Sequence, residues 1–431
     1  MQDTSNCTFA TSPQDTESRM IPNKTFVMAS DLRGLSQLGF ATAVGLTDLV
    51  EQMHGTISRA PPPFGAAVQE PTRGVTGLVY NSIRGAMRLT GGGIDRALAL
   101  LGPRPQSAGS SRSRDAALAA LNGVLGDHLV ETDNPLALPM QLRHEGRTLQ
   151  LDRQSLSDTV PSPSKRLLVL VHGLCLSDLQ WKRKGHDHGA CLAHEFGFTP
   201  VYLYYNTGLH VSANGRLFAS MLEELVAQWP APIEDFVIIG HSMGGLVARS
   251  ACHYGDAAGH CWRRGLRKLI FLGTPHHGAP LERAGNWVEL VVGKSPYTAA
   301  FTRLGKIRSA GISDLRHGNL VDEDWEGRDR FAHKNDSRTK VPLPRDVACY
   351  AIAGTTAQEA GGLSDRLVGD GLVPVASALG HHRNAARALP IPRNHQWIGC
   401  GVSHLDLLCR PDVYERIASW LKPNRQRGAS R

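Results

Sequence analysis

The chain has 431 residues, of which 41% are hydrophobic and 20% are charged. This length can bury one sizeable α/β core with additions, and the composition is that of an ordinary globular protein. The net charge of +8 gathers at the ends of elements and in flexible pieces, without the interleaved aromatic residues of a nucleic-acid surface, so we expect no nucleic-acid partner.

The N-terminal residues 1–29 are polar, and we expect them to be disordered. They contain no apolar stretch typical of a signal peptide, and no run of apolar residues in the chain is long enough to predict a transmembrane span. The eight cysteines are scattered and form no C-x-x-C pair. A reduced cytoplasmic protein is therefore favoured over an exported one with disulfides at Cys252–Cys261 and Cys400–Cys409.

Residues 30–135 predict a helical extension that contains no catalytic motif. A linker rich in Pro, Ser and Arg covers residues 102–114, and Asp115 is expected to cap the helix that follows. The predicted helices span 30–54, 74–89, 94–101 and 115–125. We interpret the extension as a brace packed on the core. The alternative is an amphipathic surface that docks on lipid, which would add peripheral membrane association to the cytoplasmic location.

An α/β core is predicted over residues 136–422. Residues 138–144 and 147–151 alternate on either side of a Gly turn, which predicts an antiparallel hairpin. Apolar runs that alternate with helical segments then predict a mostly parallel, doubly wound sheet. The expected strands are 167–171, 200–205, 235–240, 268–273 and 347–353, and a C-terminal helix is expected at 411–421.

Ser242 stands between a predicted strand and a predicted helix. The apolar residues 236–239 run into Gly-His-Ser-Met-Gly, after which a helical pattern resumes at once. Gly240 and Gly244 leave room for a strained turn, and Gly245 lets the helix pack close to the sheet. This context predicts a nucleophile elbow that presents the Ser242 hydroxyl at the carboxyl edge of a sheet.

A nucleophilic serine needs a histidine that takes its proton, a carboxylate that orients this histidine, and N–H groups that stabilise an oxyanion. The strand 167–171 is followed by His172 and Gly173. In a parallel sheet with a nucleophile elbow, the first oxyanion loop is expected at the end of this strand. The N–H groups of Leu174 and Met243 are therefore the expected oxyanion donors.

The acid and the base are expected after the serine, in that order. Asp370 lies between two glycines and leads into an apolar turn, which favours it over Asp365 in its more polar surroundings. His404 directly precedes the C-terminal helix and is the expected base, whereas His395 falls where the last strand is expected.

Residues 279–345 form a longer connection than two neighbouring strands require. This predicts an insertion that covers the active site as a lid, with a decorated surface loop as the alternative. Its apolar side chains are candidates for lining an acyl pocket: Trp287, Leu290, Val291, Tyr297 and Phe301. Residues 423–431 form a basic tail.

The chain resembles bacterial serine lipases and the lipase-like esterases related to GPI-inositol deacylase. The resemblance spans roughly residues 138–422 and depends on four motifs in the same order, at 240–249, 271–278, 369–377 and 403–408. It implies an α/β-hydrolase fold that acts on ester bonds without a cofactor. It also implies that Ser242, Asp370 and His404 form a catalytic triad.

Metal sites are not expected. Asp406 matches a calcium ligand of secreted lipases, but the cationic Arg410 stands where these proteins place an uncharged oxygen ligand. A salt bridge or a position at the start of a helix is therefore favoured for Asp406. The histidine-rich residues 186–188 and 276–277 lack the further ligands of a zinc site and are interpreted as ordinary loop histidines.

The combined pattern favours a carboxylic-ester hydrolase of lipase or esterase type, which acts on an ester or lipid through an acyl-enzyme on Ser242. A thioesterase, an acyltransferase or a polyester depolymerase would use the same triad. The alternative from another class is a non-catalytic scaffold with a hydrolase-like fold. The presence of all three triad residue types in order argues against that alternative.

Overall fold

The computed structural model describes residues 112–279, 309–327, 338–359 and 369–422. The chain forms two compact units, and one of them contains residues 115–128 and the described residues from 138 onward. The predicted disordered N-terminus, the helices predicted before residue 112, the apolar residues 287–301 of the insertion and the basic tail lie outside the described residues.

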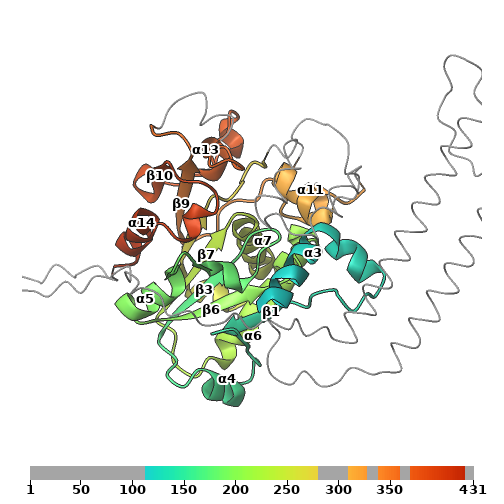
Figure 1. The fold of residues 1–431 in the computed structure, drawn as a ribbon, viewed down its shortest axis with the longest axis vertical. Coiled ribbons are helices and arrows are strands. Elements are labelled where there is room, and N and C mark those ends of the chain that lie inside the picture. The colour runs from blue at the N-terminus through green and yellow to red at the C-terminus, as the bar shows by residue number, and fades with distance from the viewer. Residues whose placement is uncertain (1–111, 280–308, 328–337, 360–368, 423–431) are drawn as a thin grey trace, which may run out of the picture. The chain divides into compact units, whose positions relative to one another are not determined.

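An eight-stranded sheet forms the centre of this unit, in the order β2-β1-β6-β3-β7-β8-β9-β10 (Figure 1). Strand β1 pairs antiparallel with β2 and β6, and all other neighbours in the sheet are parallel. The strands are β1 (Gln141–His144), β2 (Arg147–Thr148), β3 (Arg166–Val171), β6 (Phe198–Tyr204), β7 (Asp235–His241), β8 (Leu266–Leu272), β9 (Ala348–Thr355) and β10 (Gln396–Cys400). The predicted mostly parallel sheet is confirmed.

Two details of the sheet have a local cause. The first hairpin turns through Glu145 and Gly146, whose φ angles of 50° and 78° belong to the turn type that matches the twist of paired strands.

The last strand begins at Gln396, so the prediction that His395 lies in it is wrong by one residue. His395 ends the 3₁₀ helix η5 (Arg393–His395), and its Nδ1 hydrogen-bonds to the carbonyl oxygen of Cys349.

Helices cover both faces of the sheet. On one face, Leu168, Val237 and Ile270 share a buried cluster with Leu192 and Ile417. These two residues belong to α5 (His188–Phe196) and α14 (Pro411–Leu421), which lie side by side in Figure 1. Side chains alternate along a strand, so the buried strand residues between these cluster members face the other side of the sheet. On that side α6 (Val211–Gln228) and α7 (Met243–Ala257) pack together.

Smaller elements connect these layers. They are α4 (Arg153–Thr159), η1 (Asp178–Trp181), β4 (Lys182–Arg183), β5 (His186–Asp187), α8 (Trp262–Gly265), α11 (Ala310–His317), η3 (Asp322–Asp324), α13 (Val375–Ala378), η4 (Ala385–Arg387) and η6 (Asp406–Leu408). Within the described ranges, no helix combines the length and the apolar character needed to cross a bilayer.

Helix α3 (Arg112–Glu131) is longer than the helix expected over residues 115–125. It begins inside the predicted linker, so the prediction that Asp115 caps its N-terminus is wrong. The carboxylate of Asp115 instead forms an ion pair with Arg143, 3.1 Å away, on β1. The local sequence predicts that Asp115 caps the helix, whereas its carboxylate pairs with the buried guanidinium of Arg143.

Candidate active site

Ser242 occupies a strained turn between β7 and α7. Its φ and ψ angles of 54° and −124° lie in a region that side chains other than that of glycine rarely adopt. The turn is held by two main-chain hydrogen bonds, from Ser242 N to the oxygen of Leu272 (2.8 Å) and from Gly245 N to the oxygen of Ser242 (3.0 Å). The serine is therefore fixed at the carboxyl edge of the sheet.

The flanking glycines are needed because the main chain approaches itself closely. A Cβ atom on Gly240 would lie 2.6 Å from the Cα of Gly245, and a Cβ on Gly244 would lie 2.6 Å from the oxygen of His172. Side chains at either position would push α7 away from β3 and β7.

Asp370 and His404 are brought together from two loops that flank β10. His404 Nδ1 donates a hydrogen bond of 2.7 Å to Asp370 Oδ2, and both side chains are buried. The other carboxylate oxygen accepts hydrogen bonds from the main-chain N–H groups of Leu372 (3.0 Å) and Val373 (2.9 Å). The main-chain N–H of His404 also donates to the oxygen of Asp370. The carboxylate therefore orients the imidazole through Nδ1 and leaves Nε2 outside this hydrogen bond.

The same pair lies against Gly273, which follows β8. A Cβ atom on this residue would be 3.1 Å from Asp370 Oδ2 and 3.2 Å from His404 Cε1, and its φ angle is 58°. Ser242 follows β7, the next strand in the sheet, and its main-chain N–H bonds to the last residue of β8. Ser242, Asp370 and His404 thus follow the carboxyl ends of β7, β9 and β10, which are parallel strands of one sheet.

Two atoms of this group are left for a reacting molecule. Among the described residues, neither Ser242 Oγ nor His404 Nε2 has a hydrogen-bond partner, although both atoms are buried. The bond between a nucleophile and its base often tightens only when a substrate is in place. The arrangement is suited to moving a proton from Ser242 to His404.

Residues 172–178, here termed the oxyanion loop, pass directly beside Ser242. A Cβ atom on Gly173 would lie 2.9 Å from the Cβ of Ser242. The loop is fixed by a hydrogen bond from Tyr205 Oη to the oxygen of His172 (2.9 Å) and by one from Cys175 N to Thr207 Oγ1 (3.1 Å). Leu174 therefore follows a residue packed on Ser242, while Met243 begins α7, where main-chain N–H groups lack acceptors within the helix.

Cys175 is a thiol near the candidate site, because it lies two residues after Gly173, which packs on Ser242. Burial raises the pKa of its thiol to about 12, so the reactive thiolate is scarce at neutral pH. The described cysteines Cys175, Cys252, Cys261, Cys349, Cys400 and Cys409 are free thiols.

His241 contacts the expected base and was not singled out from the sequence. Its Nε2 donates a hydrogen bond of 3.1 Å to the main-chain oxygen of His404, and the two rings lie 4.7 Å apart. Burial holds the pKa of His241 well below its usual value, so the ring is neutral beside His404. Its position within the Gly-His-Ser-Met-Gly motif was the available signal.

The loop that carries His404 is also attached to the hairpin β4–β5. Lys184 forms an ion pair of 2.9 Å with Asp406, and Ser403 Oγ donates to the same carboxylate (2.6 Å). His188 Nε2 donates to the oxygen of Leu407 (2.9 Å), and burial lowers the pKa of this histidine to about 3. Asp406 is therefore a salt-bridge residue at the start of η6.

The histidine-rich segments make protein contacts. His186 Nε2 donates to His188 Nδ1 (2.7 Å), and His276 Nδ1 lies 3.3 Å from Arg249 Nη1. Within the part of the chain that the structure describes, no group of three or more ligands is arranged for a metal ion. Asp365 and the apolar residues proposed for an acyl pocket lie outside the described residues.

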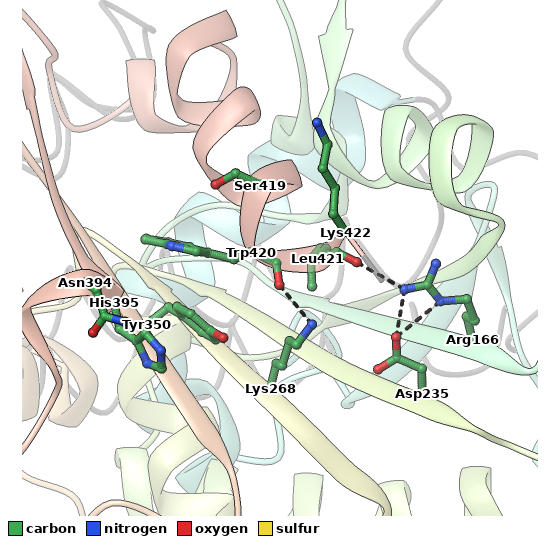
Figure 2. Close-up of a pocket in the computed structure, with 10 residues that line it drawn as sticks. All are labelled: Arg166, Asp235, Lys268, Tyr350, Asn394, His395, Ser419, Trp420, Leu421 and Lys422. Atoms are coloured by element: carbon green, nitrogen blue, oxygen red, sulfur yellow. Dashed lines mark hydrogen bonds and ion pairs between the residues drawn. The ribbon is translucent and has the colours of Figure 1, made fainter. Parts of the chain in front are cut away.

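A separate cavity of about 510 Å³ lies at the amino ends of β3, β7 and β8 (Figure 2). There Arg166 pairs with Asp235 (2.8 Å) and donates to the oxygen of Leu421, while Lys268 Nζ donates to the oxygen of Trp420 (2.9 Å). Both cations thus meet the carbonyl end of α14, where positive charge is favourable. The cavity is at the edge of the sheet opposite Ser242. Its two cations, Arg166 and Lys268, hold the C-terminal end of α14 in place.

Comparison with known proteins concerns the fold. Residues 163–342 match the model of the PGAP1-like alpha/beta domain family. No curated protein sequence matches the chain. The strand order of the sheet, with Ser242 in the turn after β7, and this family match show the α/β-hydrolase fold.

Several solved structures are also similar, at low identity. The mature lipase BlEst2 of Bacillus licheniformis is 18% identical with a TM-score of 0.37, over 57% of this chain and 88% of that one. Phospholipase PlaB from Legionella pneumophila is 18% identical with a TM-score of 0.32, over 49% of this chain and 45% of that one. The esterase of the archaeon Pyrobaculum calidifontis is 14% identical with a TM-score of 0.37, over 75% and 92%.

Proposed function

We propose that this protein is a serine hydrolase that cleaves carboxylic esters through an acyl-enzyme on Ser242. The observation that carries the proposal is the hydrogen-bonded pair Asp370–His404, which lies at the same sheet edge as the strained turn of Ser242. A serine alone is a weak nucleophile, and an oriented neutral imidazole is the group that activates it.

In the first half of the reaction, Ser242 Oγ attacks the ester carbonyl carbon while His404 Nε2 takes the hydroxyl proton. Asp370 accepts the Nδ1–H hydrogen bond and stabilises the imidazolium that forms. The N–H groups of Leu174 and Met243 donate to the oxyanion of the tetrahedral intermediate. His404 then protonates the leaving alcohol, and the acyl group remains on Ser242.

In the second half, His404 removes a proton from water, which attacks the acyl-enzyme. The same two N–H groups stabilise the second oxyanion, and the carboxylic acid leaves as His404 returns the proton to Ser242. No metal or cofactor is required in these steps, because each proton transfer and each charge has a group of this chain assigned to it.

A thioesterase, an acyltransferase and a polyester depolymerase would use the same residues, and they differ from an ester hydrolase only in leaving group or acceptor. A non-catalytic scaffold would have no use for a buried pair such as Asp370–His404 beside a strained serine. This pair is the specific reason for ranking hydrolysis above a scaffold function.

The test combines labelling with a substrate series. We expect a fluorophosphonate to label Ser242, and p-nitrophenyl esters from acetyl to palmitoyl to reveal the preferred chain length. Ser242→Ala should lower kcat about a millionfold and abolish labelling. Ser220→Ala, on the exposed side of α6, is the control and should retain both. A label on any other residue would overturn the assignment, and a folded protein inactive on the whole series would favour the scaffold.

A further inference from the structure

We infer that helix α3 is a positioning element for the oxyanion hole, acting through direct contact with the oxyanion loop. The inference rests on the proposed function, and it concerns a helix that precedes every strand of the sheet. Residues 115–128 of this helix touch the loop at two places, one beside Leu174 and one at the loop's far end.

The first contact joins main chain to main chain. Gly123 on α3 lies so close to Cys175 that an added Cβ atom would be 2.9 Å from both the nitrogen and the Cα of Cys175. Real Cβ atoms do not approach main-chain atoms this closely, so any side chain at Gly123 has to displace the loop. Cys175 is the residue after Leu174, whose N–H is one of the two proposed oxyanion donors.

Cys175 is itself held in an unusual conformation. Its φ angle is 59°, in the left-handed region that a residue with a side chain adopts only when its surroundings impose it. Burial between α3 and the sheet supplies that constraint, and the hydrogen bond from its N–H to Thr207 Oγ1 completes it. Leu174 lies between this fixed residue and Gly173, which packs on Ser242, so the main chain is held on both sides of Leu174.

The second contact is an ion cluster at the end of the loop. Arg143 on β1 pairs with Asp115 of α3 (3.1 Å) and with Asp178 of η1 (3.0 Å). The guanidinium also lies over the ring of Tyr204, with its central carbon 3.7 Å from the ring centroid. All three charged side chains are nearly buried, so water screens their attraction only weakly. The cluster therefore connects α3 to Asp178 at the end of the oxyanion loop.

The loop that follows β6 links α3 to the same place. Asn206 Nδ2 donates to the oxygen of Gly126 (3.0 Å), and a Cβ atom on Gly208 would lie 2.7 Å from the nitrogen of Gly126. Thr207, between these two residues, provides the acceptor for Cys175. Helix α3 thus supports the oxyanion loop directly at Cys175, and it also supports Thr207, which accepts the hydrogen bond of Cys175 N.

The far side of α3 is anchored independently. Ser309 Oγ donates to the oxygen of Gly123 (2.7 Å), and the N–H of Ala310 donates to Asp127 Oδ2 (2.8 Å). The start of α11 therefore fixes the helix from outside. Asp127 provides a control position, because its carboxylate accepts the N–H of Ala310 at the start of α11.

The experiment uses the full-length protein and compares Gly123→Ala with Asp127→Ala. Both changes should lower the melting temperature, and kinetics are measured where each variant is fully folded by circular dichroism. We expect Gly123→Ala to lower kcat by about tenfold or more with KM within about twofold, because a displaced oxyanion donor weakens stabilisation of the transition state. Asp127→Ala should keep kcat within about twofold of the wild type.

A transition-state analogue separates positioning from general destabilisation. An alkyl trifluoromethyl ketone, which forms an oxyanion on Ser242, should bind Gly123→Ala more weakly by about the same factor as the loss in kcat/KM. If Gly123→Ala does not fold, Asp115→Asn takes its place, since it removes one charge from the cluster without changing side-chain size. It should lower kcat several-fold in the same assay.

The outcomes distinguish this inference from the proposed function. If the wild type neither hydrolyses esters nor takes the fluorophosphonate label, the proposed function fails and the role of α3 fails with it. If the wild type is active, the positioning role alone is overturned in either of two cases. One is that Gly123→Ala (or Asp115→Asn in its place) keeps full kcat and analogue affinity. The other is that Asp127→Ala loses as much of both.

Discussion

Replacing Asp370 by asparagine should nearly abolish activity for a reason that can be traced atom by atom. In the native protein, Asp370 Oδ1 accepts the N–H groups of Leu372 and Val373, and Oδ2 accepts the Nδ1–H of His404. An asparagine must place its carbonyl oxygen toward the two main-chain donors. Its NH₂ group then faces His404 and donates to Nδ1, so the imidazole proton moves to Nε2. In that tautomer His404 has no lone pair for the proton of Ser242.

The size of the loss follows from how firmly the amide is held. Turning it over would leave the buried N–H of Val373 and the half-buried N–H of Leu372 without acceptors, at a cost of at least about 2 kcal/mol. The flipped amide, which restores the working tautomer, is therefore present in fewer than about one molecule in thirty. Residual kcat should lie between this ceiling and the roughly ten-thousandfold loss that a wrong histidine tautomer produces in a serine triad.

The assay is hydrolysis of a short p-nitrophenyl ester at pH 8, with the melting temperature measured in parallel. Asp365→Asn is the matched control, since it makes the same chemical change at the other aspartate considered as the acid, and it should leave kcat close to that of the wild type. The reasoning is refuted if Asp370→Asn, correctly folded, keeps more than about a tenth of wild-type activity. It is refuted equally if Asp365→Asn is the variant that loses activity.

Two further predictions concern pH and metal ions. Burial lowers the pKa of His172 to about 4 and that of His188 to about 3, whereas both are near 6.5 in an unfolded chain. Below pH 6.5 the unfolded chain therefore binds protons that the native chain does not, and the free energy of unfolding should fall by up to about 1.4 kcal/mol per pH unit for each histidine until pH approaches 4. The melting temperature should drop from pH 7.5 to pH 5.0, and an unchanged value would contradict this. Ester hydrolysis should be insensitive to EDTA, because Lys184 already neutralises Asp406; activity lost in EDTA and restored by calcium would refute this expectation.

Two kinds of feature of the site could be predicted from the sequence. One is set by residues adjacent in the sequence, and the other by the order of the strands and loops along the chain. The sequence around Ser242 combines an apolar strand, three glycines and a helical pattern within a dozen positions, and the structure gives each glycine a steric reason. His404 and Asp370 were located by chain order, because the connections of a parallel sheet bring the loops after successive strands to one edge. Their hydrogen bond of 2.7 Å is the contact that this order implies.

The prediction that Asp115 caps a helix is wrong because the local sequence does not show which distant residues pack against this side chain in the fold. An aspartate near the start of a helix is a good cap in isolation, and nothing in residues 112–118 reveals that Arg143 is buried 28 positions later. A buried guanidinium must be paired, and this requirement outweighs the gain from a single capping bond. The contact between Lys184 and Asp406, 222 positions apart, was hidden for the same reason.

Gly123 shows a further limit, because its contribution comes from having no side chain. Pattern analysis reads helices from where apolar side chains recur, and a glycine within a helix counts in that analysis only as a loss of helix propensity. On α3 the same glycine lets two main chains meet at Cys175, which no hydrophobic stripe would reveal. The sequence leaves the extension before the sheet as either a brace packed on the core or a lipid-docking surface, and neither interpretation places it beside the expected oxyanion donors. The contacts of residues 115–128 point inward to Cys175, the residue after the proposed oxyanion donor, so in our proposal this helix links the stability of the fold to the rate of the reaction.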